Sequence, residues 1–455
     1  MTNIPISRIH GIHWPAIGDA SAALDMSIQY QLEQSQWWSP EELLKRQFEQ
    51  LGDLLNHTYK TVPFYRNLYL EKQFRPKRIL DLEKWQQVPI VSRHMIQQAG
   101  PTLNSKQVPS QHGAASDITT SGSTGRPITV KSNQITQLFW RALNLRDHVW
   151  HKRDLSGRLA IVKTAKDGTG SPPNGTEAKS WGVATNGYKT GKSSILDISA
   201  TLDQQIAWLE KFNPHYFLTY PSNLVALADH AKNLKWNLPN LKEIRTLGEI
   251  VSVDIRERCK ETWEVKLADG YSCQEAGYLA IQCPEYDHYH VQSESILLEV
   301  LDENDLPCKS GETGRVVITS LHNYASPLVR YEIGDYAEVG ETCPCGRGLP
   351  VLNRILGRVR NMITLPNGEK HWPFVGSSAY RDIADIQQFQ LVQTKFDHLD
   401  VKLVTGEPLT KMQEQQLTEV IHQSTSFPFD ISFIYLDEIP RGKNGKYEDF
   451  ISEIS

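Results

Sequence analysis

The hydrophobic residues of the chain fall into short apolar runs and into stretches with helical spacing, and the two alternate over much of its length. Between residues 135 and 320, helical spacing is seen at Gln204–Phe212 and Ser222–Leu234, and short apolar runs lie between such stretches. Strands are expected at Leu159–Val162, Tyr216–Leu218 and Val265–Ala268. Strand–helix alternation favours a mixed α/β sheet. The stretch Lys166–Lys192, rich in Gly, Ser, Lys and Asn, predicts a long loop.

One helix is marked by its first residues. Ser39 can cap a helix that begins with Pro40, and Glu42 would complete a capping box. Helical spacing then predicts one buried stripe, formed by Leu44, Phe48, Leu51 and Leu55.

The pattern changes after Gly357. Strands are expected at Phe389–Gln393, Leu399–Val404 and Ile431–Tyr435, and a helix at Thr410–Ser424. These elements predict a small α+β module of about a hundred residues, a plausible independent unit. The expected division is therefore residues 1–356 and residues 357–455.

Composition limits the classes of function. The hydrophobic fraction of 39% and the charged fraction of 22% are typical of a soluble protein, and the net charge of −5 argues against a nucleic-acid partner. No run of about 18 apolar residues is present, so no membrane partner is expected. Met1–Ala20 lacks a basic start followed by an apolar run. We therefore expect a cytoplasmic protein, with its six cysteines as thiols or metal ligands.

The densest group of candidate functional residues is Thr119–Pro127, with the sequence TTSGSTGRP. Its first seven positions hold five hydroxyl side chains and two glycines. Backbone N–H groups and hydroxyls of this kind offer many donors to a polyanion such as triphosphate. The spacing is not that of a Walker loop. A flexible surface loop is the alternative.

This segment resembles the phosphate loop of the adenylate-forming superfamily, which includes acyl-CoA synthetases and peptide-synthetase adenylation domains. Four further motifs of that superfamily follow in its order, namely YSCQE at Tyr271–Glu275, RYEIGD at Arg330–Asp335, Gly357–Arg358, and PRGKNGK at Pro440–Lys446. Other segments are similar to the phenylacetate–CoA ligase-like branch, namely Pro63–Tyr65, Thr319–Leu321, Pro327–Tyr331 and Cys343–Arg347. The resemblance implies an α/β fold with a large N-terminal AMP-binding domain of mixed sheets and helices and a mobile C-terminal α+β domain.

The resemblance also implies ATP and Mg²⁺ as cofactors. The phosphates would be held by Thr120, Ser121, Gly122, Ser123, Thr124 and Gly125. Glu275 would bind Mg²⁺, for which a hard carboxylate is suitable. Tyr271 would lie near the adenine or the acyl group. Asp335 would accept hydrogen bonds from both ribose hydroxyls, and Arg358 would contact ribose or phosphate.

Lys446 would bridge the α-phosphate and the acyl carboxylate, a task that suits a point charge on a flexible stem. Lys443 is a competing lysine, and a surface position is the alternative for either. Four aromatics lie near regions that line the acyl pocket in relatives, namely Trp140, Phe217, Tyr220 and Trp181. Gly248 and Glu249 resemble a Gly-Glu pair that lines this pocket, with a surface position as the alternative for Glu249. The four aromatics favour an aromatic acid, although core packing is their commoner role.

A second constellation is independent of ATP. Cys343 and Cys345 lie on a Pro/Gly-rich turn, and Cys283 precedes His290 by seven positions. Three thiolates and one imidazole satisfy tetrahedral zinc, which would be structural in a closed site. His288 is a competing ligand, and buried free cysteines are the alternative.

The leading hypothesis is a two-step acid–thiol ligase. A small carboxylic acid and ATP would give an acyl-adenylate and pyrophosphate, and coenzyme A would then take the acyl group. The alternatives are transfer to a carrier-protein phosphopantetheine or an amine, and a non-catalytic binding protein with this fold. Arg360 stands where many relatives carry Asp or Lys, which leaves the acceptor open. A homodimer is also left open.

Overall fold

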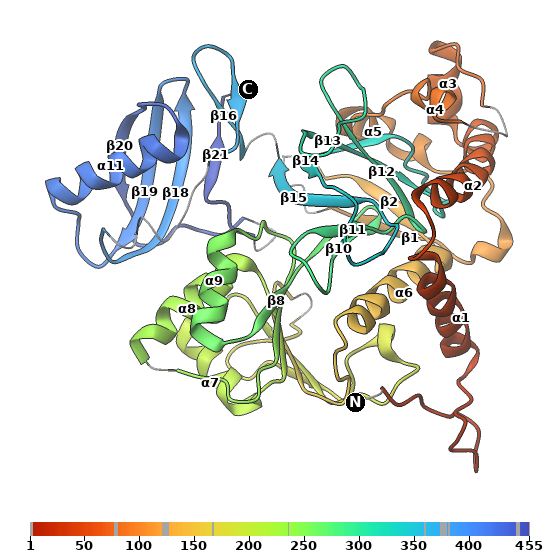
Figure 1. Ribbon diagram of the computed structural model, residues 1–455, viewed down its shortest axis with the longest axis horizontal. Helices are drawn as coiled ribbons and strands as arrows, with labels where there is room; N and C mark the ends of the chain where they lie inside the picture. The colour runs from red at the N-terminus through yellow and green to blue at the C-terminus, as the bar shows by residue number, and fades with distance from the viewer. Residues whose placement is uncertain are drawn as a thin grey trace.

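The computed structural model describes residues 3–76, 81–120, 127–165, 168–234, 236–358, 361–373, 380, 383–442 and 446–454. It has the predicted mixed α/β architecture with a separate C-terminal α+β domain, drawn in blue in Figure 1. The helices are α1 (Ala20–Ser35), α2 (Pro40–Thr61), α3 (Pro63–Glu71), α4 (Leu82–Gln86), α5 (Arg93–Ala99), α6 (Gln134–Trp150), α7 (Leu202–Phe212), α8 (Pro221–Leu234), α9 (Val253–Trp263) and α11 (Lys411–Thr425).

A six-stranded sheet has the order β4-β5-β3-β6-β7-β8. Its strands are β3 (Leu159–Lys163), β4 (Thr176–Ala178), β5 (Ser193–Asp197), β6 (Tyr216–Thr219), β7 (Glu243–Thr246) and β8 (Lys266–Ala268). All neighbours are parallel except the edge strand β4, which is antiparallel to β5. The predicted strands and helices of this region are confirmed. The predicted long loop contains β4 and a short 3₁₀ turn at Val183–Thr185.

A seven-stranded antiparallel sheet has the order β12-β13-β14-β15-β11-β10-β9. Its strands are β9 (Gly270–Cys273), β10 (Gly277–Gln282), β11 (Tyr289–Val291), β12 (Ile296–Leu301), β13 (Thr313–Ser320), β14 (Tyr331–Val339) and β15 (Val351–Arg358). The ribbon β1 (Ser116–Thr119) and β2 (Thr129–Ser132) leads into and out of the predicted phosphate loop.

The C-terminal domain has a four-stranded sheet in the order β20-β19-β18-β21, with α11 packed on it (Figure 1). Its strands are β18 (Ile386–Lys395), β19 (His398–Thr405), β20 (Asp430–Tyr435) and β21 (Phe450–Ser452), and β16 (Ile363–Thr364) pairs with β17 (Lys370–His371). This domain has its own apolar core, which includes Ile363, Leu399, Leu417 and Phe450. Because β15 runs to Arg358, the sheet of the large domain continues slightly past the expected boundary at residue 356.

Helix α2 tests the capping and the buried stripe predicted from the sequence. Ser39 Oγ accepts from the Glu42 N–H at 3.3 Å, as expected of an N-cap. The Glu42 carboxylate accepts from Arg46 Nε at 3.0 Å instead of completing a capping box. Leu51 and Leu55 are fully buried, whereas the predicted Leu44 and Phe48 are only partly buried at the edge of the core. None of the helices in the described part of the chain combines the length and apolar character needed to cross a bilayer.

Replacing Ser39 by alanine should cost about 1 kcal/mol of stability, because the Glu42 N–H loses its acceptor. Urea unfolding monitored by circular dichroism measures the change. Ser27→Ala is the matched control, since Ser27 is exposed on α1 and alanine suits a helix interior. Equal midpoints for the two variants would contradict the capping role.

Candidate active site

A cavity of about 1790 Å³ lies where the two large sheets and the C-terminal domain meet. Residues distant in sequence converge on it. Those predicted from sequence that line it are Thr120, Trp140, Tyr220, Gly248, Glu249, Tyr271, Glu275, Asp335, Arg358 and Lys446. The predicted phosphate-loop residues Ser121, Gly122, Ser123, Thr124 and Gly125 lie outside the described residues, as do Arg360 and Lys443.

Asp335 lies in one wall of the cavity. The register of β14 and β15 places it opposite Arg358, and Arg358 Nε lies 3.4 Å from Asp335 Oδ1. The Tyr271 hydroxyl, from β9, donates to Asp335 Oδ2 at 2.8 Å. Burial, reinforced by the Asp335 charge, raises the pKa of Tyr271 well above its usual range, so the phenol keeps its proton. The Asp335 carboxylate is therefore fixed from two sides and remains open toward the cavity.

Arg93 is a site residue that the sequence did not reveal. It is the first residue of α5, whose N-cap is Ser92. Arg93 Nη1 lies 3.2 Å from Glu275 Oε1, and Arg93 Nη2 donates to Thr120 Oγ1 at 3.2 Å. One guanidinium thus joins the predicted metal ligand to the first residue of the predicted phosphate loop. An arginine at a helix start carries no local signature of this long-range contact.

Lys446 reaches the cavity from the C-terminal domain. A Cβ built on Gly248 would lie 3.0 Å from Lys446 Cε and 3.4 Å from Nζ, so the lysine passes directly over this glycine. Gly248 has φ +76°, a region that side chains other than glycine rarely adopt. Burial and the nearby Arg358 lower the pKa of Lys446, while Asp335 and Glu249 oppose that shift. The ammonium therefore lies among the groups expected to surround a nucleotide.

Glu249 joins the two domains. Its Oε2 accepts from the Ser222 N–H at 2.9 Å, and its Oε1 accepts from the Tyr447 N–H at 2.7 Å. Arg441 Nη1 lies 3.5 Å from Oε1 and donates to Ser222 Oγ at 2.7 Å. Burial raises the pKa of Glu249, and these donors oppose the shift. We call Glu249, Ser222, Arg441 and Tyr447 the interdomain cluster. It anchors the residue next to Lys446.

Tyr220 forms the wall beside Gly248. Its ring atom Cε1 is 3.6 Å from the position of a Gly248 Cβ, and its hydroxyl donates to Thr164 Oγ1 at 3.3 Å. Trp140 projects from α6 and is 43% exposed. Of the other two aromatics considered from sequence, Phe217 is buried in the core under α7 and α8, and Trp181 packs edge-on against Tyr216.

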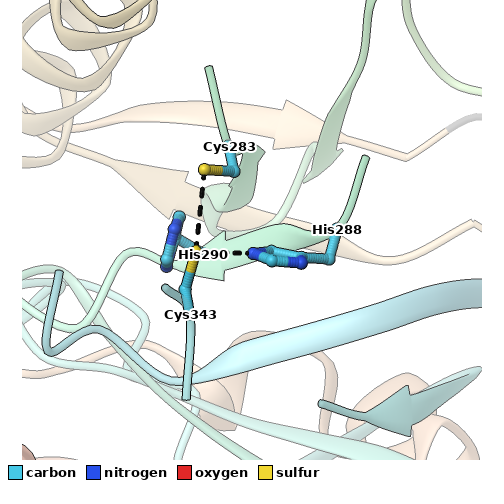
Figure 2. A group of neighbouring side chains, drawn as sticks. All are labelled: Cys283, His288, His290 and Cys343. Carbon is cyan, nitrogen blue, oxygen red and sulfur yellow. Dashed lines mark hydrogen bonds between the residues drawn. The ribbon is translucent and has the colours of Figure 1, made fainter. Parts of the chain in front are cut away.

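The predicted metal-ligating residues meet outside this cavity, around the turn that joins β14 to β15 (Figure 2). One candidate ligand atom from each of Cys283, His288, His290 and Cys343 lies within 4.8 Å of the others. His288 Nε2 is 2.9 Å from Cys343 Sγ, and Cys283 Sγ is 3.9 Å from it. Cys345, which the sequence placed in the set, is adjacent, with Sγ 3.4 Å from His290 Nε2. The structure therefore brings His288 into the group and leaves Cys345 at its edge.

The chemistry of this cluster fits a soft divalent cation. Ligand atoms around tetrahedral zinc lie about 3.3–3.8 Å apart, given bonds of about 2.0–2.3 Å. Burial lowers the pKa of His290 to about 4, so its imidazole is neutral as a metal ligand must be. Burial also raises the pKa of Cys343 to about 12, and a bound cation would reverse this shift.

Comparison with known proteins agrees with the motifs. The CapK C-terminal domain family matches residues 369–453. The phenylacetate-coenzyme A ligase of Thermus thermophilus is 25% identical over 397 residues, covering 83% of this chain and 84% of that protein. The crystal structure of 2-hydroxyisobutyryl-CoA ligase in the postadenylation state superposes with a TM-score of 0.73 at 20% identity, covering 93% of this chain and 92% of that one. The same ligase in the thioesterification state gives 0.60 at 20% identity, covering 92% and 91%.

The fold is thus the one seen in 2-hydroxyisobutyryl-CoA ligase, and the C-terminal domain matches the CapK C-terminal domain family. In sequence, the chain is similar to phenylacetate–CoA ligases over most of its length. The similarity to phenylacetate–CoA ligases expected from the sequence motifs is confirmed. The assignment of individual site residues stays a prediction.

Removing the Glu249 carboxylate should loosen the C-terminal domain, because the Tyr447 and Ser222 N–H groups lose their shared acceptor. We expect Glu249→Ala to speed amide hydrogen exchange at Tyr447 and Ser222 by about tenfold or more, corresponding to about 1.4 kcal/mol. Glu407→Ala, at an exposed position of the C-terminal domain, is the control. Unchanged exchange at Tyr447 would show that the interdomain cluster does not hold the domains together.

Proposed function

We propose that the protein uses ATP to activate a small carboxylic acid to an acyl-adenylate and then transfers the acyl group to coenzyme A. Aromatic acids are the first candidates for the substrate. The observation that carries the proposal is the placement of Lys446 in one cavity with Asp335 and Arg358. These three residues come from two domains. A binding scaffold would not need a cation delivered to this point by a separate domain.

In the first step, a carboxylate oxygen of the acid attacks the α-phosphorus of ATP, and pyrophosphate leaves. Asp335 would accept the ribose hydroxyls, and its bonds to Arg358 and Tyr271 hold it ready to do so. Lys446 would lie between the acid carboxylate and the α-phosphate, where negative charge develops. Positioning and charge stabilisation of this kind account for most catalysis at phosphorus centres.

Glu275 would hold Mg²⁺ together with phosphate oxygens, and the ion would offset phosphate charge. The fit is reasonable because the carboxylate lines the cavity and is bonded through Oε1 to Arg93. The Arg93 guanidinium, which donates to Thr120, would then also face the phosphates. The chain itself therefore contributes an anion and a cation side by side.

In the second step, the thiolate of coenzyme A attacks the acyl carbonyl, and AMP leaves. Lys446 must withdraw for a bulky thiol to enter, which requires a second domain orientation. The TM-score is higher with the ligase in the postadenylation state than with the same ligase in the thioesterification state. This difference supports the view that the present structure has the orientation in which Lys446 lies in the cavity. Gly357, at φ +81° in β15 and within the proposed junction Leu356–Arg358, is suited to absorb the backbone change.

The test of the first step is pyrophosphate release from ATP with a panel of carboxylic acids. Lys446→Ala should retain ATP binding but lower adenylation by about 100-fold or more, the usual effect of removing one electrostatic stabiliser. Thioester formation from synthetic acyl-adenylate should fall much less. Near-normal release by Lys446→Ala would refute its role and direct the same test to Lys443.

The acceptor is tested separately, by giving the wild-type protein and its acid either coenzyme A, a phosphopantetheinylated carrier protein, or hydroxylamine as an amine. We expect an acyl-CoA thioester as the main product. Robust adenylation without that thioester would refute coenzyme A and favour whichever acceptor is acylated. Absence of adenylation with every acid would favour the non-catalytic alternative.

We also propose one structural zinc ion per chain, bound by thiolate and imidazole groups of the cluster in Figure 2. Cys283, His290 and Cys343 are common to the expectation from sequence and to the geometric group. The fourth position is contested by Cys345 and His288, whose ligand atoms lie beside His290 and Cys343 respectively. Zinc would tie the β10–β11 hairpin to the turn before β15, away from the reacting groups.

Metal analysis of protein purified without chelator should find about one zinc per chain, and chelation should lower the melting temperature, since the metal binds the folded state. Cys283→Ser should lose the ion. Of His288→Ala and Cys345→Ser, the variant that loses zinc identifies the fourth ligand. A metal-free wild-type protein with unchanged melting after Cys343→Ser would leave buried thiols as the explanation.

A further inference from the structure

Lys163 is a basic residue of the cavity wall to which the proposed chemistry gives no task. It is the last residue of β3, at the carboxyl end of a parallel strand. Val162 packs into the core under α7 and α8, so the alternation of a strand directs Lys163 to the opposite face. Lys163 lines the cavity and is half-buried there.

Three arginines described at this site, unlike Lys163, have carboxylate partners. Arg93, Arg358 and Arg441 lie 3.2, 3.4 and 3.5 Å from the oxygens of Glu275, Asp335 and Glu249. For the Lys163 ammonium, the described part of the chain supplies no hydrogen bond or ion pair. Burial alone lowers the pKa of Lys163. Partial removal of an unpaired ammonium from water is costly, and an anion beside it offsets that cost.

The carboxylate next to Lys163 in the sheet is already occupied. The β3–β5 register pairs Lys163 with Asp197. Asp197 Oδ2 accepts from the Ala165 N–H at 2.7 Å, and Oδ1 accepts from the Ser199 N–H at 2.9 Å. Asp197 therefore closes the loop ends after β3 and β5, and its bonds are to backbone.

Tyr220 connects Lys163 to the reaction centre. One edge of its ring lies over Gly248, where Lys446 passes, and its hydroxyl bonds to Thr164, the residue after Lys163. An acid lying along this ring, with its reacting carboxylate at Lys446, would extend toward Lys163. The two lysines would then face opposite ends of one small molecule.

We propose that Lys163 is a specificity-determining residue and that the acid carries a second negatively charged group, such as a carboxylate, at the end remote from the reacting one. The inference rests on the proposed function, because it assigns the substrate class of the same cavity. A charge-assisted hydrogen bond from the Lys163 ammonium selects such an acid over its singly charged analogue. A neutral end group would leave the ammonium unpaired.

Matched pairs of acids test the proposal. Pyrophosphate release is measured with adipate against hexanoate and with 4-carboxyphenylacetate against phenylacetate. We expect kcat/KM for the dicarboxylate of at least one pair to exceed that of its partner by about tenfold or more. Lys163→Met should remove this preference and leave kcat/KM for the monocarboxylate within about twofold of the wild-type value. Lys163→Arg should keep it, since the charge remains. Lys192→Met, at an exposed position outside the cavity, is the control.

The proposal would be overturned if the wild-type protein showed no dicarboxylate preference in either pair, or preferred the monocarboxylate in both. An equal loss for all four acids in Lys163→Met would also overturn it, because that loss marks a structural role. If no acid gives pyrophosphate, the proposed adenylation fails independently, and calorimetric titration decides the role of Lys163. Selective loss of adipate binding in Lys163→Met would support the role, and equal adipate binding to both proteins would overturn it.

Discussion

One buried carboxylate, that of Glu249, ties the C-terminal domain to the large domain. A buried carboxylate is stable only when donors surround it, and here the donors come from both domains: the Ser222 N–H from one, the Tyr447 N–H and Arg441 from the other. Neither domain alone satisfies the charge. Because Tyr447 follows Lys446 directly, this contact fixes how far the lysine extends into the cavity. The placement of this segment thus rests on one hydrogen bond donated by its backbone and on one ion pair from a side chain.

The remaining walls of the cavity follow from sheet topology. Parallel strands place their carboxyl ends along one edge, which brings Lys163 from β3, Tyr220 after β6 and Gly248 after β7 to the same face of the cavity. The antiparallel sheet supplies the opposite wall through the β14–β15 register that pairs Asp335 with Arg358. Two sheets with different hydrogen-bonding patterns therefore contribute different chemistry, namely a wall with Lys163 and Tyr220 against a wall with the Asp335–Arg358 pair.

Much of this arrangement could be predicted, because short motifs with a fixed order specify residues such as Tyr271, Asp335 and Lys446 without any knowledge of the fold. Strands β3 and β6 were also predictable from their apolar runs. Edge strand β4 was not, since its exposed residues gain strand structure only by pairing with β5. Arg93 and the Glu249–Tyr447 bond were equally hidden, because they join positions separated by more than 180 residues. The proximity of His288 to Cys343 depends on how the β10–β11 hairpin bends, which spacing does not encode.

The delivery of Lys446 across a domain boundary makes docking of the C-terminal domain and occupation of the cavity thermodynamically linked. Any molecule that contacts Lys446 binds the docked arrangement better than the undocked one, and by reciprocity it favours docking by the same factor. The interdomain cluster sets the starting point of that equilibrium before any molecule is bound. A stronger Glu249 contact would raise the affinity for such a molecule and, equally, hold back the withdrawal of Lys446. The strength of the Glu249 contact is therefore a compromise between holding a molecule in the cavity and letting the C-terminal domain undock.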